Sequence, residues 1–269
     1  MIDATQVSLR IGGRGLLEDV SFAASPGEFI AVLGPNGVGK TTLLRAIAGM
    51  HPVSHGLLRV AGRPITEYTP GERARTIAFM VSDDSAVESM SVRDAVAAGR
   101  FAYHQWWEWH ERERDTVVIE QALQAVHMDA FARRDFATLS SGERQRVWLA
   151  LGLAQEAPVL LLDEPTSHLD VRVSHEILQL LRIQARGGKT VICVLHDMNE
   201  ALEFADRLLV LGERTLLAVD TPQAIVAARK LDQAYGITLE TLRTAAGAIR
   251  VFPSALSTEE DPPGRHLTH

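Results

Sequence analysis

A glycine-rich loop directly after a short apolar segment is the feature that most constrains this chain. The loop follows the apolar residues Phe29 to Leu33 and reads Gly34-Pro35-Asn36-Gly37-Val38-Gly39-Lys40-Thr41-Thr42. A buried strand, glycines that let backbone N–H groups face a polyanion, and a helix starting near the Lys-Thr pair make a phosphate-binding P-loop. Lys40 supplies a charge to the β- and γ-phosphates, and the Thr41 hydroxyl is placed to ligate Mg²⁺. The sequence therefore predicts a site for a nucleoside triphosphate.

A second apolar run, Val159 to Leu162, ends in the acidic pair Asp163 and Glu164. A carboxylate at the C-terminal end of a strand, downstream of a P-loop, is the Walker B arrangement. Asp163 is expected to hold Mg²⁺, directly or through water, and Glu164 to polarise the attacking water as a base. The alternative is an ordinary strand end before a turn at Pro165, but the upstream P-loop favours the catalytic interpretation.

Between these motifs lies the segment Leu139-Ser140-Ser141-Gly142-Glu143-Arg144-Gln145-Arg146. Ser140 and the backbone around Gly142 are predicted to open a helix, and a helix start with a serine hydroxyl is a second anion site. The alternative is a capping box, in which Ser140 and Glu143 only secure the helix start. The segment resembles the signature motif of ATP-binding cassette (ABC) ATPases, usually Leu-Ser-Gly-Gly-Gln. A P-loop, a signature and a Walker B strand in this order are typical of that family.

The resemblance implies an α/β fold: a P-loop NTPase with a RecA-like parallel-sheet core, an antiparallel β subdomain and an inserted helical subdomain. A chain of 269 residues is long for a single core, so one domain with a subdomain inserted is more natural than two independent domains. We expect the ABC ATPase domain at residues 1–240, with the helical subdomain at about 86–155. Residues 241–269 are expected to form a C-terminal extension whose polar, proline-containing end is disordered.

Two further residues match the family's pattern. Asp170 ends the segment Ser167-His168-Leu169-Asp170, where the family has its D-loop, and would cross the dimer interface. His196 follows the apolar run Val191 to Leu195 and matches the switch histidine that contacts the γ-phosphate, although a lone histidine at a strand end is usually structural. In the family, the P-loop of one copy and the signature of another enclose one ATP. The resemblance therefore implies a second copy of this chain, or another cassette, as a partner.

Three features depart from the family's pattern. Ser82 stands where the Q-loop glutamine is expected, and its short side chain could touch the metal only through a water. Ile11 occupies the place of the aromatic residue that stacks on adenine, so base stacking would weaken to apolar contact. In the signature, Ser141 replaces the second glycine and Glu143 the glutamine. None of these removes the phosphate and Mg²⁺ machinery, but the first bears on coupling to a membrane subunit.

Composition argues against several other classes of protein. A net charge of -7 disfavours nonspecific nucleic-acid binding as the main activity. The single cysteine, Cys193, lies within an apolar run and is interpreted as a small buried hydrophobe rather than a redox or metal residue. The apolar stretches fall far short of the ~20 residues that a spanning helix needs, and the N-terminus does not read as a secretory signal. We therefore expect a protein that stays in the compartment where it is made.

One stretch resembles a particular group within the family. The segment Val87 to Arg100, followed by Phe101 and Tyr103, is similar to the same stretch in the ATPases of iron-siderophore, haem and vitamin B12 importers. The run Trp106-Trp107-Glu108-Trp109 also resembles that group, with an exposed aromatic patch for packing or partner contact as the alternative. The resemblance implies import of an iron complex, a ferric siderophore before haem or cobalamin. An exporter ATPase and a soluble ABC ATPase without a membrane partner are the remaining alternatives.

This group also implies particular partners. They are separate transmembrane permease subunits and, indirectly, a periplasmic or surface solute-binding protein, with no nucleic acid. The chain is then expected to sit as a peripheral subunit on the cytoplasmic face of the cell membrane and to use ATP and Mg²⁺. Soluble family members carry long coiled-coil insertions or tandem cassettes, and neither is visible in this sequence. Cargo specificity would reside in the membrane and periplasmic subunits.

Overall fold

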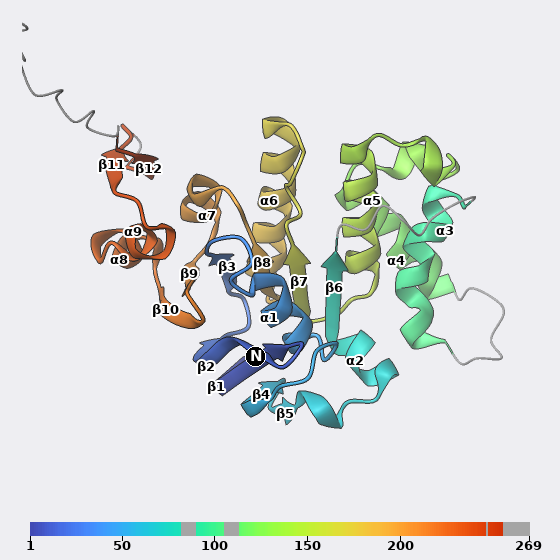
Figure 1. The fold of residues 1–269 in the computed structure, drawn as a ribbon. Coiled ribbons are helices and arrows are strands. Elements are labelled where there is room, and N and C mark those ends of the chain that lie inside the picture. The colour runs from blue at the N-terminus through green and yellow to red at the C-terminus, as the bar shows by residue number, and fades with distance from the viewer. Residues whose placement is uncertain (82–89, 105–112, 246, 255–269) are drawn as a thin grey trace, which may run out of the picture.

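The computed structural model describes residues 1–81, 90–104, 113–245 and 247–254. Its centre is a six-stranded sheet with the strand order β10-β9-β3-β8-β7-β6 (Figure 1). Neighbouring strands run parallel except β10, which pairs antiparallel with β9. The strands are β3 (Phe29–Leu33), β6 (Ile77–Val81), β7 (Val159–Asp163), β8 (Thr190–Val194), β9 (Arg207–Gly212) and β10 (Thr215–Asp220). Every residue of β3, β7 and β8 is buried, as expected for parallel strands that are covered on both faces.

Strand β3 is shared by two hydrophobic cores. Phe29, Ala31 and Leu33 belong to one buried cluster, while the two residues between them belong to a second cluster. Successive side chains of a strand point to opposite faces, so each face of the sheet has its own core. Cys193 of β8 is fully buried in the first cluster, and burial raises the pKa of its thiol well above the usual value. The prediction of a small buried hydrophobe at this position is confirmed.

A smaller antiparallel sheet packs against one face of the central sheet. Its strand order is β2-β1-β4-β5, with bounds β1 (Ile2–Ile11), β2 (Arg14–Ala24), β4 (His55–Val60) and β5 (Arg63–Pro64). Helix α1 (Lys40–Ile47) contributes Leu43, Leu44 and Ile47 to the cluster that also contains the buried side chains of β1. The short helices η1 (Ile65–Glu67) and α2 (Pro70–Thr76) lead the chain back to β6. The antiparallel β subdomain is therefore present as expected.

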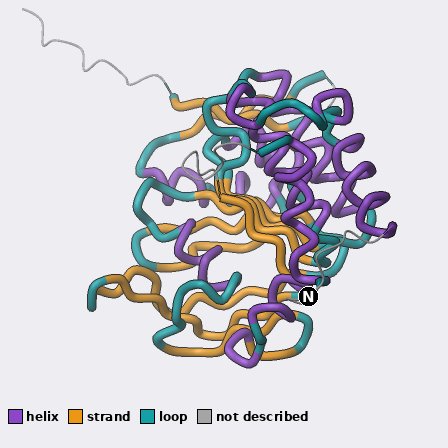
Figure 2. Tube along the Cα trace, turned by 90° about the vertical axis from the view of Figure 1, so that its right-hand side faces the viewer, coloured by secondary structure: helices purple, strands orange, loops and turns teal. Residues whose placement is uncertain are grey.

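The described chain between β6 and β7 is helical and gathers on one side of the central sheet (Figure 1, Figure 2). Its elements are α3 (Val92–Ala97), η2 (Ala98–Tyr103), α4 (Glu113–Ala125), η3 (Asp129–Phe131), η4 (Phe136–Thr138) and α5 (Ser141–Ala154). The sequence predicts one helix over Val92 to Arg100, whereas the α-helix ends at Ala97 and a 3₁₀ segment follows. At this point the backbone closely approaches α5, because a Cβ atom on Gly99 would lie 2.5 Å from the carbonyl oxygen of Leu151. The tryptophan-rich run at residues 106–109 lies outside the described residues.

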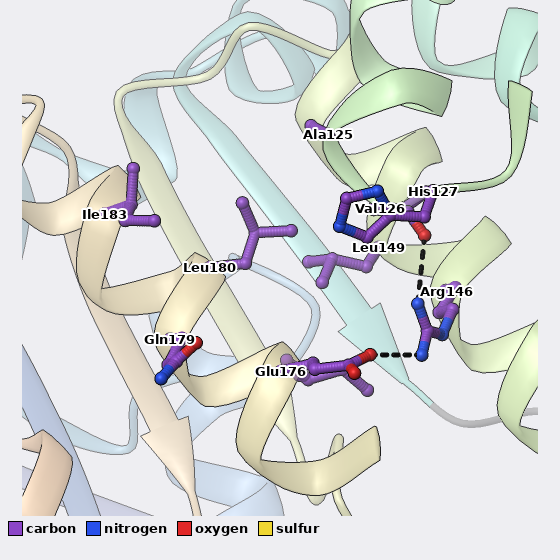
Figure 3. Close-up of a pocket in the computed structure, with 10 residues that line it drawn as sticks. Ala125, Val126, His127, Arg146, Leu149, Glu176, Gln179, Leu180 and Ile183 are labelled. Carbon is purple, nitrogen blue, oxygen red and sulfur yellow. Dashed lines mark hydrogen bonds and ion pairs between the residues drawn. The ribbon is translucent and has the colours of Figure 1, made fainter. Parts of the chain in front are cut away.

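The helical region meets the core at α6 (Val171–Arg186). Arg146 of α5 forms an ion pair with Glu176 of α6, and it donates a hydrogen bond to the carbonyl oxygen of Val126, 3.3 Å away (Figure 3). A pocket of about 150 Å³ lies beside this contact, with Leu149 and Leu180 in its wall. One guanidinium group thus joins the end of the α4 segment, the signature helix and the core.

The C-terminal part of the chain folds against the far edge of the central sheet. It follows β10 and contains α8 (Pro222–Ala227), α9 (Lys230–Tyr235) and the antiparallel hairpin β11 (Leu239–Arg243) and β12 (Ile249–Pro253). Helix α7 (Met198–Phe204), between β8 and β9, packs into the core on one face of the sheet. The Asn199 side chain holds the hairpin to α7: it donates to the carbonyl oxygen of Val251 at 3.2 Å and accepts from its N–H at 2.9 Å. The predicted domain end at residue 240 falls within β11, and this boundary stays a prediction. The expected disordered end lies beyond residue 254, outside the described residues.

A buried guanidinium group secures the helical region. Arg100 and Asp115 are each 3% exposed, and the Arg100 Nε atom lies 2.7 Å from Asp115 Oδ1. The Nη1 atom of Arg100 also donates to the carbonyl oxygen of Ala154 at 2.7 Å and pairs with Glu156 at 2.8 Å. A charge in this position is stable only while its partners remain in place.

Arg100→Met is expected to lower the free energy of unfolding by about 3–5 kcal/mol, because it removes one partner of a buried ion pair. Arg172→Met is the matched control: Arg172 also pairs with a glutamate, Glu176 at 2.9 Å, but its side chain is 86% exposed. Arg172→Met should lower the free energy of unfolding by about 0–1 kcal/mol. Urea unfolding of both variants and the wild type measures the difference, and equal unfolding midpoints would contradict the expectation.

Candidate nucleotide-binding site

The P-loop connects β3 to α1 and depends on glycine at three positions. Gly34, Gly37 and Gly39 have φ values of 152°, 77° and 110°, which side chains rarely allow. A Cβ atom on Gly34 would also lie 2.6 Å from the carbonyl oxygen of Leu211. Helix α1 begins at Lys40, with Gly39 as its N-cap residue. The positive end of the helix therefore opens onto the loop, as a phosphate site requires.

The Lys40 side chain folds back onto the P-loop and binds its backbone. Its Nζ atom donates to the carbonyl oxygens of Gly34 at 2.7 Å and Pro35 at 3.0 Å. Burial lowers the pKa of Lys40, while the nearby charges of Glu164 and Asp163 raise it. An ammonium group has three donors, so two hold the loop in shape and one is left for a phosphate oxygen.

Asp163 and Thr41 meet at the C-terminal end of β7, and their arrangement fits a cation with oxygen ligands. The Asp163 side chain is buried, and this burial raises its pKa. The neighbouring Thr41 side chain favours the charged form of Asp163 and so lowers its pKa, while the adjacent Glu164 charge raises it. Within the described part of the chain, Asp163 Oδ1 is buried without a hydrogen-bond partner. Mg²⁺ is held in such sites by one or two carboxylates together with phosphate oxygens, so these residues fit the ion that the sequence implies.

The side chains of Glu164 and His196 are in contact at the ends of two adjacent strands. The distance between Glu164 Oε1 and His196 Nε2 is 2.6 Å, and both side chains are partly exposed. Glu164 has a left-handed backbone, with φ 56°, and its N–H donates to the carbonyl oxygen of Val194. The Ser167 hydroxyl lies 3.4 Å from the other carboxylate oxygen of Glu164. The structure thus brings together the two residues that the sequence predicts to be catalytic, and it adds Ser167 as a neighbour.

The signature residues are placed at the start of α5. Ser140 is the N-cap residue: its hydroxyl accepts from the Glu143 N–H at 3.3 Å, and the Glu143 carboxylate accepts from the Ser140 N–H at 2.7 Å. These hydrogen bonds to Ser140 lower the pKa of Glu143. The capping box considered as an alternative is therefore formed in the single chain. Ser141 and Gly142 occupy the first turn, and contact of this segment with ATP on a second copy stays a prediction.

The other predicted residues lie apart from this centre or outside the described residues. Asp170 caps α6 by accepting a hydrogen bond from the Val173 N–H at 3.0 Å. Ile11 ends β1 with 53% of its surface exposed. Its contact with adenine and the place of Asp170 in a dimer stay predictions. Ser82 lies outside the described residues, so its role toward the metal also stays a prediction.

One contact with the P-loop has no counterpart in the sequence motifs. The Tyr235 hydroxyl oxygen, at the end of α9, accepts a hydrogen bond from the Gly34 N–H at 3.1 Å. The two residues are 201 positions apart, so no local pattern could have indicated the contact. Ser167, in contrast, lies three residues after Glu164 and could have been recognised as its neighbour from that spacing.

Comparison with known proteins agrees with the motifs. A family model for ABC transporters matches residues 17–167. The hemin import ATP-binding protein HmuV of Gloeobacter violaceus is 37% identical over 277 residues, which cover 100% of this chain and 99% of that protein. The ferric enterobactin transport ATP-binding protein FepC of Escherichia coli is 35% identical and covers 86% of each chain.

Solved structures share the fold. A metal-chelate type ABC transporter in an inward-facing conformation gives a TM-score of 0.82 with 26% identity, covering 94% of this chain and 96% of that one. A dimeric ATP-binding cassette, MJ0796, bound to ADP and Pi gives a TM-score of 0.71 with 24% identity, covering 82% and 99%. The predicted fold class, a P-loop NTPase of the ABC type, is confirmed. The chain therefore belongs to the ABC transporter family, as one of its ATP-binding subunits.

Proposed function

We propose that this chain hydrolyses ATP to drive an importer of iron complexes, with a ferric siderophore as the first candidate solute. The observation that carries the enzymatic part is the convergence of Lys40, Asp163 and the Glu164–His196 pair at the C-terminal ends of β3, β7 and β8. The transport part is supported by relatives named for hemin import and ferric enterobactin transport, and by the likeness to a metal-chelate type transporter.

Each residue of the site has its own role in ATP hydrolysis. The P-loop amides and the Lys40 ammonium bind the phosphates, and Asp163 and Thr41 would hold Mg²⁺, which would neutralise phosphate charge. Glu164 accepts a proton from the attacking water, because its carboxylate is partly exposed and lies near the Lys40 ammonium of the loop. The Nε2 atom of His196 lies 2.6 Å from this carboxylate and orients it. Fixed donors around the developing charge lower the barrier.

A complete site needs a second chain, because this sequence contains one P-loop and one signature. The second copy would supply Ser140 and Gly142 to the γ-phosphate, and Asp170 would lie at the interface. Permease subunits would cross the membrane, with a periplasmic or surface solute-binding protein as an indirect partner. No helix within the described ranges combines the length and the apolar character of a membrane span. A peripheral position on the cytoplasmic face of the membrane fits this arrangement.

Haem and cobalamin are the rival solutes, and an exporter or a soluble ABC ATPase is the rival role. A growth test separates them: the gene is deleted and the strain is supplied with a ferric siderophore, haem or cobalamin as the limiting nutrient. Loss of growth on the siderophore alone, restored by the wild-type gene but not by its Glu164→Gln variant, is the expected result. A defect confined to haem or to cobalamin would reassign the solute. Normal growth in all three media would contradict the importer.

His196→Ala is expected to lower ATP turnover by about 10- to 100-fold and to change MgADP affinity little, because His196 contacts Glu164 rather than the loop. His175→Ala is the matched control. His175 is an exposed histidine on α6 that contacts Gln179 and the Phe204 ring. Steady-state ATPase assays with calorimetric titration of MgADP measure both quantities. Unchanged turnover in His196→Ala would make this histidine structural.

A further inference from the structure

The C-terminal segment of the domain reaches the P-loop at one point, the end of α9. Helix α9 ends at Tyr235, which is partly buried, and burial raises the pKa of its phenol. The phenol oxygen accepts a hydrogen bond from the Gly34 N–H, at 3.1 Å. Gly34 is the residue at which the chain leaves β3 and enters the loop. Tyr235 thus contacts the first residue of the P-loop, directly after β3.

Both backbone polar groups of Gly34 are held by side chains. Tyr235 accepts from its N–H, and the Lys40 ammonium donates to its carbonyl oxygen at 2.7 Å. Gly34 needs this support because its φ of 152° is open to glycine alone, and glycine loses the most conformational freedom when it is fixed. A loop that is already fixed before the ligand arrives binds it more tightly than a loop that must be ordered on binding.

Packing alone does not fix this flank of the loop. A cleft of about 840 Å³ separates it from the β9–β10 turn and α9. The cleft is lined on the loop side by Pro35, Asn36, Gly37 and Val38. Across this cleft, the hydrogen bond at Gly34 is the polar contact that joins the loop to α9 within the described residues.

We propose that Tyr235 is a positioning residue for nucleotide binding, which holds the P-loop in its binding shape through the Gly34 N–H. The inference rests on the proposed role of the P-loop. It assigns the C-terminal segment of the domain a part in affinity for the nucleotide, although that segment lies far from the motifs in sequence. Tyr235 contacts the loop through the Gly34 N–H and lies away from the Glu164–His196 pair, so we expect it to set binding rather than the chemical step.

Tyr235→Phe removes the acceptor and keeps the ring. The Kd for MgADP and the KM for MgATP are both expected to rise about three- to tenfold, the range that loss of one hydrogen bond gives, while kcat stays within about twofold. MgADP is the binding probe, because it reports on the loop without the closed dimer that ATP favours. Hydrogen exchange at the Gly34 amide should also become faster in this variant.

Tyr68→Phe is the matched control, because the Tyr68 hydroxyl donates to the carbonyl oxygen of Val60 at 2.6 Å in the antiparallel subdomain. Its Kd and KM should equal those of the wild type. A Tyr235→Phe variant with unchanged Kd and KM would overturn the inference, as would one in which kcat falls while KM stays constant, because that pattern marks a general loss of folded protein. A wild-type chain that fails to bind MgADP would overturn the proposed function together with the inference.

Discussion

Replacing Glu164 by Gln is expected to lower ATP turnover by about 10²–10⁴-fold, the contribution of a general base, and to leave ATP binding intact. The amide has the shape of the carboxylate but cannot accept a proton from water. Its oxygen can still accept a hydrogen bond from His196, which lies 2.6 Å from the carboxylate in the wild type. The geometry of the site therefore survives while the chemistry stops.

Two measurements check this prediction. Steady-state assays give the turnover, and size-exclusion chromatography with ATP and Mg²⁺ should show the Glu164→Gln variant as a stable dimer, because ATP is no longer consumed. Glu200→Gln is the control: its carboxylate is half-buried near the same strand ends and accepts from the Thr166 hydroxyl at 3.0 Å, and burial raises its pKa. Turnover in the control should stay within about twofold of wild type. Wild-type turnover in Glu164→Gln would remove Glu164 from catalysis.

Lys40→Ala is expected to weaken nucleotide binding and hydrolysis together. The change removes a positive charge opposite the β- and γ-phosphates. It also leaves the carbonyl oxygens of Gly34 and Pro35 without their donor, so the loop loses part of its support. We expect turnover to fall by about 10²–10³-fold, as for loss of one charge-stabilising donor, with affinity for MgADP at least about tenfold weaker.

Lys189→Ala is a close control for this variant. Lys189 is also partly buried, its pKa is also lowered by burial, and its Nζ atom donates to the carbonyl oxygen of Ala157 at 2.8 Å. It precedes β8, at the opposite end of the strand from His196. Calorimetry with MgADP and a steady-state assay should leave Lys189→Ala close to wild type. An ATPase rate for Lys40→Ala within a few-fold of wild type would exclude Lys40 from the site.

The parts of the site that could be predicted are those encoded in contiguous sequence. The P-loop and the pair Asp163–Glu164 follow their strands directly, so strand, loop and side-chain order can be read along the chain. The Glu164–His196 contact was not predictable in the same way, because it requires β7 and β8 to be neighbours. The family's pattern identified both residues, but it did not predict that Glu164 Oε1 lies 2.6 Å from His196 Nε2.

The parts that were missed depend on contacts between distant segments. Helix α3 was expected to continue to Arg100, but it changes to a 3₁₀ segment where Gly99 meets the backbone of α5. The C-terminal hairpin was not predicted, because Asn199 holds it through hydrogen bonds that span 52 positions. Tyr235 belongs to the same class, since its contact with the loop forms only in the folded domain.

The position of β3 in the sheet has a consequence for synthesis of the chain. Its two neighbours, β8 and β9, are made later than the other parallel strands of the sheet, and Phe29 pairs with Val191. At roughly 5–20 residues per second, the ribosome needs about 10–35 s to go from β3 to the end of β9. During that interval a fully apolar strand is without its partners, so the newborn chain exposes a segment prone to aggregation. The strand that carries the P-loop is therefore a segment that chaperones would protect until β9 emerges.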